Sequence, residues 1–315
     1  MATSKQAAQV VNHALLEQLS NAGMKKQAED AINSYTRSIL REEGFFRKVI
    51  PMQEISDDEL DVQLGTDLPV KIVFKEPLSP GAMTIPFAGA PRTFQIRGPN
   101  YPVYFGRIVG PKHMKDVDEL RVYPFDIRQV LTDHSIRDIQ EEEDKRFITD
   151  SVDAAMIGAD QTSPFTNQVQ WKTLYGGWTR DNVAEAFKML PRGNARLKAD
   201  KCIINNVTVY DFQKWGRDEM GGDLSQEILK NGRAEGSWLS GDFMQTTWMV
   251  TIKQNLVPDN TMYQFATPDY LGKSFSLTDI TLYVDRKGPV IEFYPYETIG
   301  GALGNLAGVA RVDVR

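Results

Sequence analysis

The stretch LTDHSIRDIQEEEDKRFITDSVDAAMIGA, residues 131–159, is the longest uninterrupted helical pattern in the chain. It contains no proline, and its first glycine is Gly158. Its centre, residues 140–146, contains no apolar residue. On both sides of this centre, apolar residues recur near one face of a helix. Thr132 or Asp126 is placed to cap the start of this helix, and Gly158 to end it. The pattern predicts a long helix that is buried at each end and exposed to water at its centre.

The centre of this predicted helix is strongly acidic. Glu141, Glu142 and Glu143 are consecutive, and residues 132–160 hold nine acids and three bases. This excess equals the net charge of the whole chain, −6, so the remainder is balanced and carries no basic footprint for nucleic acid. Consecutive carboxylates point in different directions on a helix and do not form a facing catalytic pair. A solvated helix face is therefore the favoured interpretation.

The composition is that of an ordinary globular protein of one large or two ordinary domains. The chain has 315 residues, of which 41% are hydrophobic and 25% charged. No apolar run approaches the roughly 18 residues that span a membrane, and the N-terminus does not resemble a secretory signal. Cys202 is the single cysteine, which excludes an intrachain disulfide and a cysteine-based zinc site. We expect Cys202 to be a small buried hydrophobe.

The N-terminal region reads as helical arms followed by an apolar anchor. Residues 4–21 and 24–43 have helical patterns, and the second is amphipathic. Gly44 ends this second helix, and Phe45 and Phe46 supply new apolar surface directly after it. An amphipathic arm of this kind has to dock on something, and another chain is one candidate.

Residues 52–124 change to short runs punctuated by proline and glycine. Residues 70–74 and 92–97 are strand candidates, the second alternating cleanly, and the turn-rich segment EPLSPGAMTIPFAGAP lies between them. A third run, 101–109, is interrupted by Pro102 and Gly106. The pattern predicts a long projecting β-hairpin. Because an isolated two-stranded hairpin is marginal in water, we expect a neighbouring subunit to complete it.

The chain after the long helix predicts a mixed α and β body. Thr179 is placed to cap a helix at 180–190, which Pro191 and Gly193 end. Strands after residue 240 follow one another too closely for parallel βαβ units, which favours an antiparallel or mixed sheet. The other predicted elements are a helix at 207–217 and strands at 201–205, 248–253, 262–266, 281–285, 290–294 and 309–314.

Motifs of enzyme chemistry are missing. His13, His113 and His134 are scattered, without the spacing of metal ligands, and no nucleophile motif such as G-x-S-x-G occurs. Gly300, Gly301 and Gly304 superficially suggest a nucleotide loop, but the lysine and hydroxyl residue of a phosphate-binding loop are missing. A tight loop where backbones approach closely is the favoured interpretation. We predict no enzyme, no cofactor and no metal.

The order of these parts resembles the major capsid proteins of tailed bacteriophages, which have the Hong Kong 97-type fold. The arm, ending in SILREEGFFRKVIP (38–51), leads to an extended loop at 64–111 and then to a spine helix at 131–159. In the C-terminal part, KCIINNVTVYDFQKW (201–215) is similar to the start of the family's axial domain. IEFYPYETIGGALGNLAGVARVDV (291–314) is similar to its closing sheet and glycine-bearing loop.

The resemblance implies an α+β fold with an N-terminal arm, an extended β-hairpin loop, a long spine helix, and peripheral and axial domains. The corresponding ranges are 1–51 for the N-terminal helices and arm, 52–125 for the extended loop and adjoining strands, 126–200 for the peripheral domain with the spine helix, 201–300 mainly for the axial domain, and 301–315 for a strand returning to the peripheral domain.

The resemblance also implies a function: self-assembly as pentamers and hexamers into an icosahedral head shell around double-stranded DNA, without sequence-specific binding and without a membrane. It implies a virion protein assembled in the host cytoplasm, with portal and scaffolding proteins as partners and a decoration protein as an open option. The expected assembly residues are Phe45, Phe46, Arg92, Phe94, Arg97, Glu141, Glu142, Glu143, Ile299, Gly300, Gly301 and Leu303.

Two alternatives stay open at this point. One is an encapsulin-type cellular nanocompartment, a related shell that stores an enzyme. The other is a soluble hydrolase whose site is assembled from distant carboxylates. For the capsid reading, a further hypothesis is that the acidic helix face lines the shell and repels packaged DNA; a merely solvated face is favoured over it.

Overall fold

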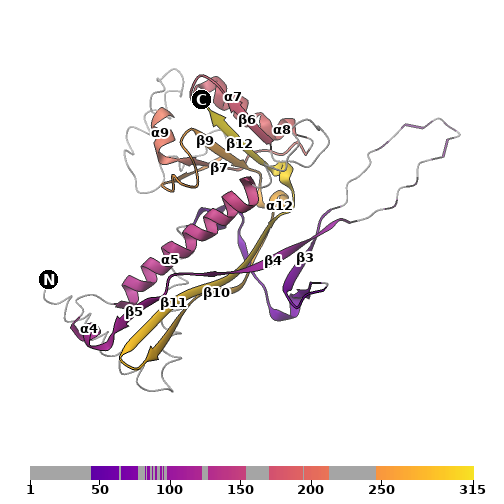
Figure 1. The fold of residues 1–315 in the computed structure, drawn as a ribbon. Helices are drawn as coiled ribbons and strands as arrows, with labels where there is room; N and C mark the ends of the chain where they lie inside the picture. The colour runs from indigo at the N-terminus through magenta and orange to yellow at the C-terminus, as the bar shows by residue number, and fades with distance from the viewer. Residues whose placement is uncertain are drawn as a thin grey trace.

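The computed structural model describes two β-sheets and a long helix (Figure 1). The predicted helices at 4–21 and 24–43 lie outside the described residues, as do Arg92, Phe94 and Arg97. The structure describes residues 44–63, 65–76, 98–122, 127–153, 170–193, 195–212 and 246–315, together with residues 82, 84, 85, 87, 89, 90, 93 and 95.

The larger sheet is built on a long antiparallel hairpin. β10 (Gly272–Lys287) and β11 (Val290–Leu303) are joined by a tight turn in which Gly288 has a φ of +65°, a conformation that glycine adopts without strain. Within the described residues, the order of the sheet is β1 (Met52–Glu54), β10, β11, β4 (Asn100–Val109), β3 (Pro69–Phe74) and β2 (Asp61–Val62), and β5 (His113–Asp116) also pairs with β11.

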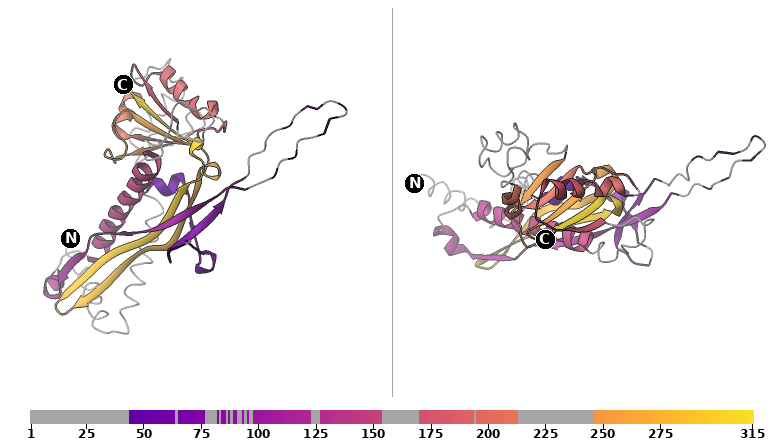
Figure 2. Two further views of the ribbon diagram at one scale, coloured as in Figure 1. Left: turned by 45° about the vertical axis from the view of Figure 1, so that its right-hand side comes forward. Right: turned by 90° about the horizontal axis from the view of Figure 1, so that it is seen from above.

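β3 and β4 form the base of the predicted projecting hairpin and lead away from the body of the molecule (Figures 1 and 2). The strand predicted at 70–74 is confirmed. Its partner is β4, with Phe74 opposite Asn100. Most of the strand predicted at 92–97 lies outside the described residues. β4 runs unbroken through Pro102 and Gly106, contrary to the expected interruption.

The smaller sheet is mixed, as predicted. Within the described residues its order is β6 (Gln170–Leu174), β12 (Val309–Val314), β9 (Thr261–Phe265), β7 (Lys201–Asn205) and β8 (Thr247–Thr251). β6 and β8 pair in parallel with their neighbours, whereas β9 is antiparallel to both of its partners. The predicted strands at 201–205 and 262–266 are confirmed within one residue.

Three helices pack on this smaller sheet through a separate apolar cluster that includes Trp178, Leu190, Phe212 and Trp248. They are α7 (Arg180–Phe187), α8 (Met189–Arg192) and α9 (Asn206–Phe212). The predicted cap is confirmed, since Oγ1 of Thr179 accepts a hydrogen bond of 3.3 Å from the amide of Asn182. Pro191 lies inside α8 and does not end the helical segment.

The long helix lies beside the β10–β11 hairpin and reaches the smaller sheet at one end (Figure 1). α5 (Ile127–Lys145) continues as a π-helical segment, η2 (Arg146–Asp153). It begins before the predicted start, and Thr132 is a buried residue inside it, not its cap. The other short elements are α3 (Phe45–Val49), α4 (Val117–Val122), α12 (Pro268–Leu271), η1 (Asp57–Glu59) and η3 (Leu306–Gly308).

The main core gathers side chains from α3, α5, η2 and both sheets. Phe147 lies at its centre, with ring centroids 5.0 Å from Phe46 and 5.4 Å from Phe265. At the end of η2, Asp153 accepts hydrogen bonds of 3.1 Å from the hydroxyl of Tyr263 and 3.1 Å from Arg311. The helix is therefore fixed to both sheets, through apolar packing along its length and polar contacts at its end.

Strand pairing connects segments that are distant in the sequence. β10 and β11, within 201–300, pair with β1 and β4, whereas β12, within 301–315, pairs with β6 and β9. The strands predicted at 281–285 and 290–294 are the adjoining ends of two much longer strands.

Candidate functional site

Among the described residues, no group of three or more His, Cys, Asp or Glu side chains is placed to hold a metal ion. Cys202 is buried, and burial raises the pKa of its thiol, which disfavours the reactive thiolate. The part of the chain that the structure describes contains no helix long and apolar enough to cross a membrane.

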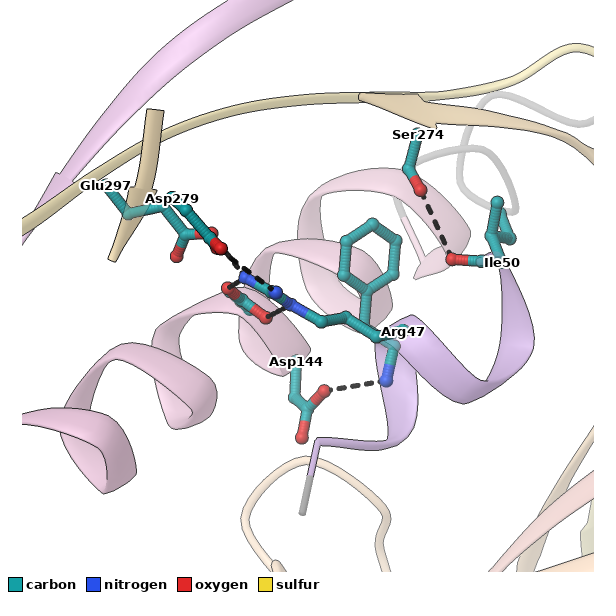
Figure 3. Close-up of polar contacts among 8 residues, drawn as sticks. Arg47, Ile50, Asp144, Ser274, Asp279 and Glu297 are labelled. Carbon is teal, nitrogen blue, oxygen red and sulfur yellow. Dashed lines mark hydrogen bonds and ion pairs between the residues drawn. The ribbon is translucent and has the colours of Figure 1, made fainter. Parts of the chain in front are cut away.

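A buried charge cluster joins α3 to α5 and to the β10–β11 hairpin (Figure 3). Arg47 of α3 donates two hydrogen bonds to Glu143 of α5, from Nε at 3.1 Å and from Nη2 at 2.8 Å. The Nη2 group also contacts Glu297 of β11, and Nη1 lies 3.7 Å from Asp279 of β10. Such a two-point contact between guanidinium and carboxylate fixes direction as well as distance.

The carboxylates of this cluster are taken out of water. The side chains of Glu143 and Glu297 have no exposed surface, and that of Arg47 is 14% exposed. Burial acts to lower the pKa of Arg47, but the hydrogen bond to Glu143 and the charges of Glu143, Glu297 and Asp279 outweigh it and raise that pKa. Arg47 is therefore permanently charged in the folded protein.

A second ion pair lies beside the first. Asp144 accepts a hydrogen bond of 2.9 Å from the amide of Phe46 at the start of α3, and one of 2.6 Å from Nζ of Lys253. Burial raises the pKa of Asp144, and the charge and hydrogen bond of Lys253 oppose that rise. The ammonium group of Lys253 also lies 5.7 Å from the centre of the Phe45 ring. Asp144 thus supplies the capping acceptor that α3 lacks in its own sequence.

The predicted anchor residues Phe45 and Phe46 are part of this chain's own core. Both are buried, and Val49 and Ile50 are buried with them. The backbone that follows α3 is held as well, because Oγ of Ser274 donates hydrogen bonds of 3.2 Å to the carbonyl oxygens of Ile50 and Pro51. Burial of a large apolar side chain contributes about 1.5–3 kcal/mol. The anchor therefore packs into the core of the chain that carries it.

The acidic centre of the helix is partly buried, so the prediction of a solvated centre is wrong. Glu141 is exposed and Glu142 half-buried, but Glu143 and Asp144 are buried. Glu142 lies 3.2 Å from Lys145 and 3.7 Å from Arg146. The hypothesis that this helix face repels DNA can therefore be tested by charge reversal only at Glu141 and Glu142. A basic residue at position 143 would face the positive charge of Arg47.

The residues expected to form capsomer contacts lie in β11: Ile299, Gly300, Gly301 and Leu303. Ile299 is buried in the main core, and Leu303 packs against that core. Gly300 and Gly301 are strand residues, so the tight loop predicted there is wrong. The close approach is confirmed at Gly300, where a Cβ atom would lie 2.8 Å from the carbonyl oxygen of Tyr104 on β4.

We expect Gly300→Ala to destabilise the fold by about 1–3 kcal/mol, because the added methyl group has to push β4 away. Chemical denaturation of the variant measures the loss. Gly98→Ala is the matched control, since a Cβ atom there would meet its nearest neighbour, a carbonyl oxygen, at an ordinary 3.7 Å. Equal stability of the two variants would contradict the close packing at Gly300.

Apolar side chains are exposed on the projecting hairpin. Ile72, Phe74 and Tyr104 lie on one face of the β3–β4 pair, and Phe74 is 77% exposed. Ile85 and Phe87, in the segment beyond β3, are exposed as well. Exposed apolar groups of this kind mark interaction sites when they cluster. The predicted residues Arg92, Phe94 and Arg97 of the same hairpin lie outside the described residues.

Sequence analysis missed Arg47, Glu297 and Lys253. Glu297 has a local signal, because it falls on the inward face of β11 between the buried Phe293 and Ile299. Glu143 has one too, since it lies four residues from both Ile139 and Phe147 on a helix. Arg47 has none, because its partners are 96 and 250 residues away in the sequence.

Solved structures of shell proteins have the same fold. The capsid protein of a native GTA particle aligns with a TM-score of 0.60 at 12% identity, over 85% of this chain and 89% of that one. The mature capsid of bacteriophage PhiM1 gives 0.58 at 9% identity, over 86% and 87%. A virus-like particle from Pyrococcus furiosus gives 0.54 at 14% identity, over 90% and 98%. No family model and no curated sequence matches the chain.

These similarities define the class of the fold. The chain has the α+β, Hong Kong 97-type fold of capsid proteins, as the sequence resemblance predicts. The long helix α5 with η2 corresponds to the expected spine helix, and the β3–β4 pair to the base of the expected extended loop.

Proposed function

We propose that this protein is a major capsid protein that self-assembles, as pentamers and hexamers, into the icosahedral head shell of a tailed phage. The observation that carries the proposal is the combination of a shell-protein fold with a projecting hairpin whose apolar side chains, such as Phe74 and Tyr104, are exposed in the described part of the chain. The shell encloses double-stranded DNA and requires no base-specific contacts. The protein is located in the virion, and the shell assembles in the host cytoplasm.

Multivalency is the physical basis of such a shell. Each contact between subunits contributes modestly, but a subunit held by several neighbours at once is retained far longer than one held by a single contact. Portal and scaffolding proteins are further proposed partners, and a decoration protein is an optional one. We also propose that axial contacts around the symmetry axes hold the pentamers and hexamers together.

An encapsulin-type nanocompartment is the second candidate. The similarity to the virus-like particle from Pyrococcus furiosus favours it, because the alignment covers 98% of that chain. A protein shell around enzyme cargo and a head around a genome use the same fold, so the contents of the particle, and not the fold, separate the two functions.

The purified chain is expected to elute near the void volume of a size-exclusion column and to form closed shells in electron micrographs. Nucleic-acid content then separates the candidates: particles filled with DNA after infection support the phage head, whereas small shells with protein cargo support the nanocompartment. Elution as a small oligomer under all conditions would contradict both and would favour a soluble enzyme.

A further inference from the structure

Among the described residues, the cluster around Arg47 holds more carboxyl groups than positive charges. Glu143 faces Arg47 from α5, Glu297 from β11 and Asp279 from β10, so three carboxyl groups surround one guanidinium. The neighbouring cation, Lys253, forms an ion pair with Asp144, with 2.6 Å between Nζ and Oδ2. Glu143 and Glu297 have no exposed side-chain surface, so water does not compensate their charges. An unpaired buried charge is costly, and proteins avoid it by binding a proton.

The hydrogen bonding of Glu297 identifies where that proton lies. Its Oε1 contacts Nη2 of Arg47. Its Oε2 is buried and accepts no hydrogen bond from any donor in the described part of the chain. Oε1 of Glu143 accepts a hydrogen bond of 2.8 Å from the same Nη2 atom, so the two buried carboxyl groups meet at one guanidinium nitrogen, and both are acceptors while both are ionised. A proton on Oε2 turns this pair of acceptors into a donor and an acceptor.

We propose that Glu143 and Glu297 share one proton, which fastens α3 to α5 and β11 at neutral pH and whose loss at alkaline pH weakens this junction. With this proton, Glu143 and Glu297 together carry a single negative charge opposite Arg47: one carboxylate remains for the two-point contact with Arg47, and a neutral carboxyl group bridges from β11. Two buried carboxyl groups at one site behave in this way because they cannot both ionise without repulsion.

The electrostatics of the site agree with this assignment. Burial raises the pKa of Glu297, and the charge and hydrogen bond of Glu143 raise it further, while Arg47 opposes them. An ordinary glutamate has a pKa of about 4.3. Between that value and the raised one, the folded chain binds a proton that the unfolded chain has released. Stability therefore falls as the pH rises through this window.

Infrared spectroscopy and thermal melting of the full chain test the proposal, with Glu297→Gln as the key variant. The amide keeps a donor toward Glu143 and an acceptor toward Arg47 without a titrating proton. The unaltered chain is expected to show the carbonyl band of a protonated, buried carboxyl group at pH 7, and to lose about 3 °C of melting temperature per pH unit above neutrality from this site. In the variant, the band is absent and this slope disappears.

Glu292→Gln is the matched control on the same strand. Glu292 lies 2.7 Å from Lys112 and 3.0 Å from Lys287, and hydrogen bonds from these lysines lower its pKa, so its replacement leaves the infrared band and the alkaline slope in place. Absence of the band from the unaltered chain at pH 7 would overturn the proposal even if Glu297→Gln failed to fold. An unchanged alkaline slope in a folded Glu297→Gln protein would also overturn it. Neither result bears on shell assembly, since the cluster lies within one chain.

Discussion

Deletion of residues 79–91 is expected to leave a soluble, folded chain that forms no shells. β3 and β4 pair through residues 70–74 and 100–104 and join β11, so the remaining sheet does not depend on the deleted segment. The described residues of that segment, including Ile85 and Phe87, are exposed and add nothing to the core of the chain. If the hairpin is completed by a neighbouring subunit, its loss removes one of the contacts on which multivalent retention depends.

Electron micrographs and size-exclusion chromatography measure the outcome, and circular dichroism confirms the fold. A sharper variant, Phe87→Ser, removes one exposed apolar side chain and is expected to weaken assembly without changing the stability of the free chain. Substituting the same segment by a glycine–serine linker of equal length controls for chain connectivity. Normal particles from the deletion variant would contradict the assignment of this hairpin as an assembly element.

Arg47→Met is expected to destabilise the fold by about 3–5 kcal/mol, because it leaves buried Glu143 and Glu297 without their cation while keeping most of the side-chain volume. Removal of one partner from a buried ion pair is far more damaging than replacement of the whole pair. The triple replacement Arg47→Met, Glu143→Leu, Glu297→Leu is therefore expected to recover part of the loss. Urea denaturation at pH 7 measures both.

Arg192→Met is the matched control for Arg47→Met. Arg192 lies 3.0 Å from Glu185, but its side chain is 61% exposed, so its ion pair contributes little to stability. Similar losses from the two substitutions would mean that the cluster around Arg47 behaves as an ordinary surface ion pair, contrary to its burial.

Local sequence signals predicted the elements that depend on nearby residues. Thr179 caps α7 through a contact three residues away, and the strand at 201–205 has the β-branched pair Ile203 and Ile204 near its centre. The order of arm, hairpin and long helix was sufficient to suggest the fold, because that order is itself a sequence property. The interruption predicted from Pro102 and Gly106 was wrong, because both residues lie within β4, which pairs with β3 and β11.

The candidate site was harder to predict because its partners are distant in sequence. A run such as QEEEDKR is hydrophilic on average, and only its register on the helix separates the exposed Glu141 from the buried Glu143. That register becomes decisive once Arg47 is known to lie opposite. The full length of β10 was also hidden, because irregular pairing near Ser276 and Thr278 interrupts the alternation that marks a regular strand.

The separation of these partners along the chain also affects how the protein is made. The contact between Arg47 and Glu297 closes a span of 250 residues, and that between Phe46 and Asp144 closes one of 98. Contacts of such long range form slowly, because the entropy of loop closure has to be paid before they stabilise anything. During synthesis on the ribosome, Phe45 and Phe46 emerge long before β11 exists. The nascent chain therefore carries an uncovered apolar segment for most of its translation, which is the kind of segment that chaperones bind.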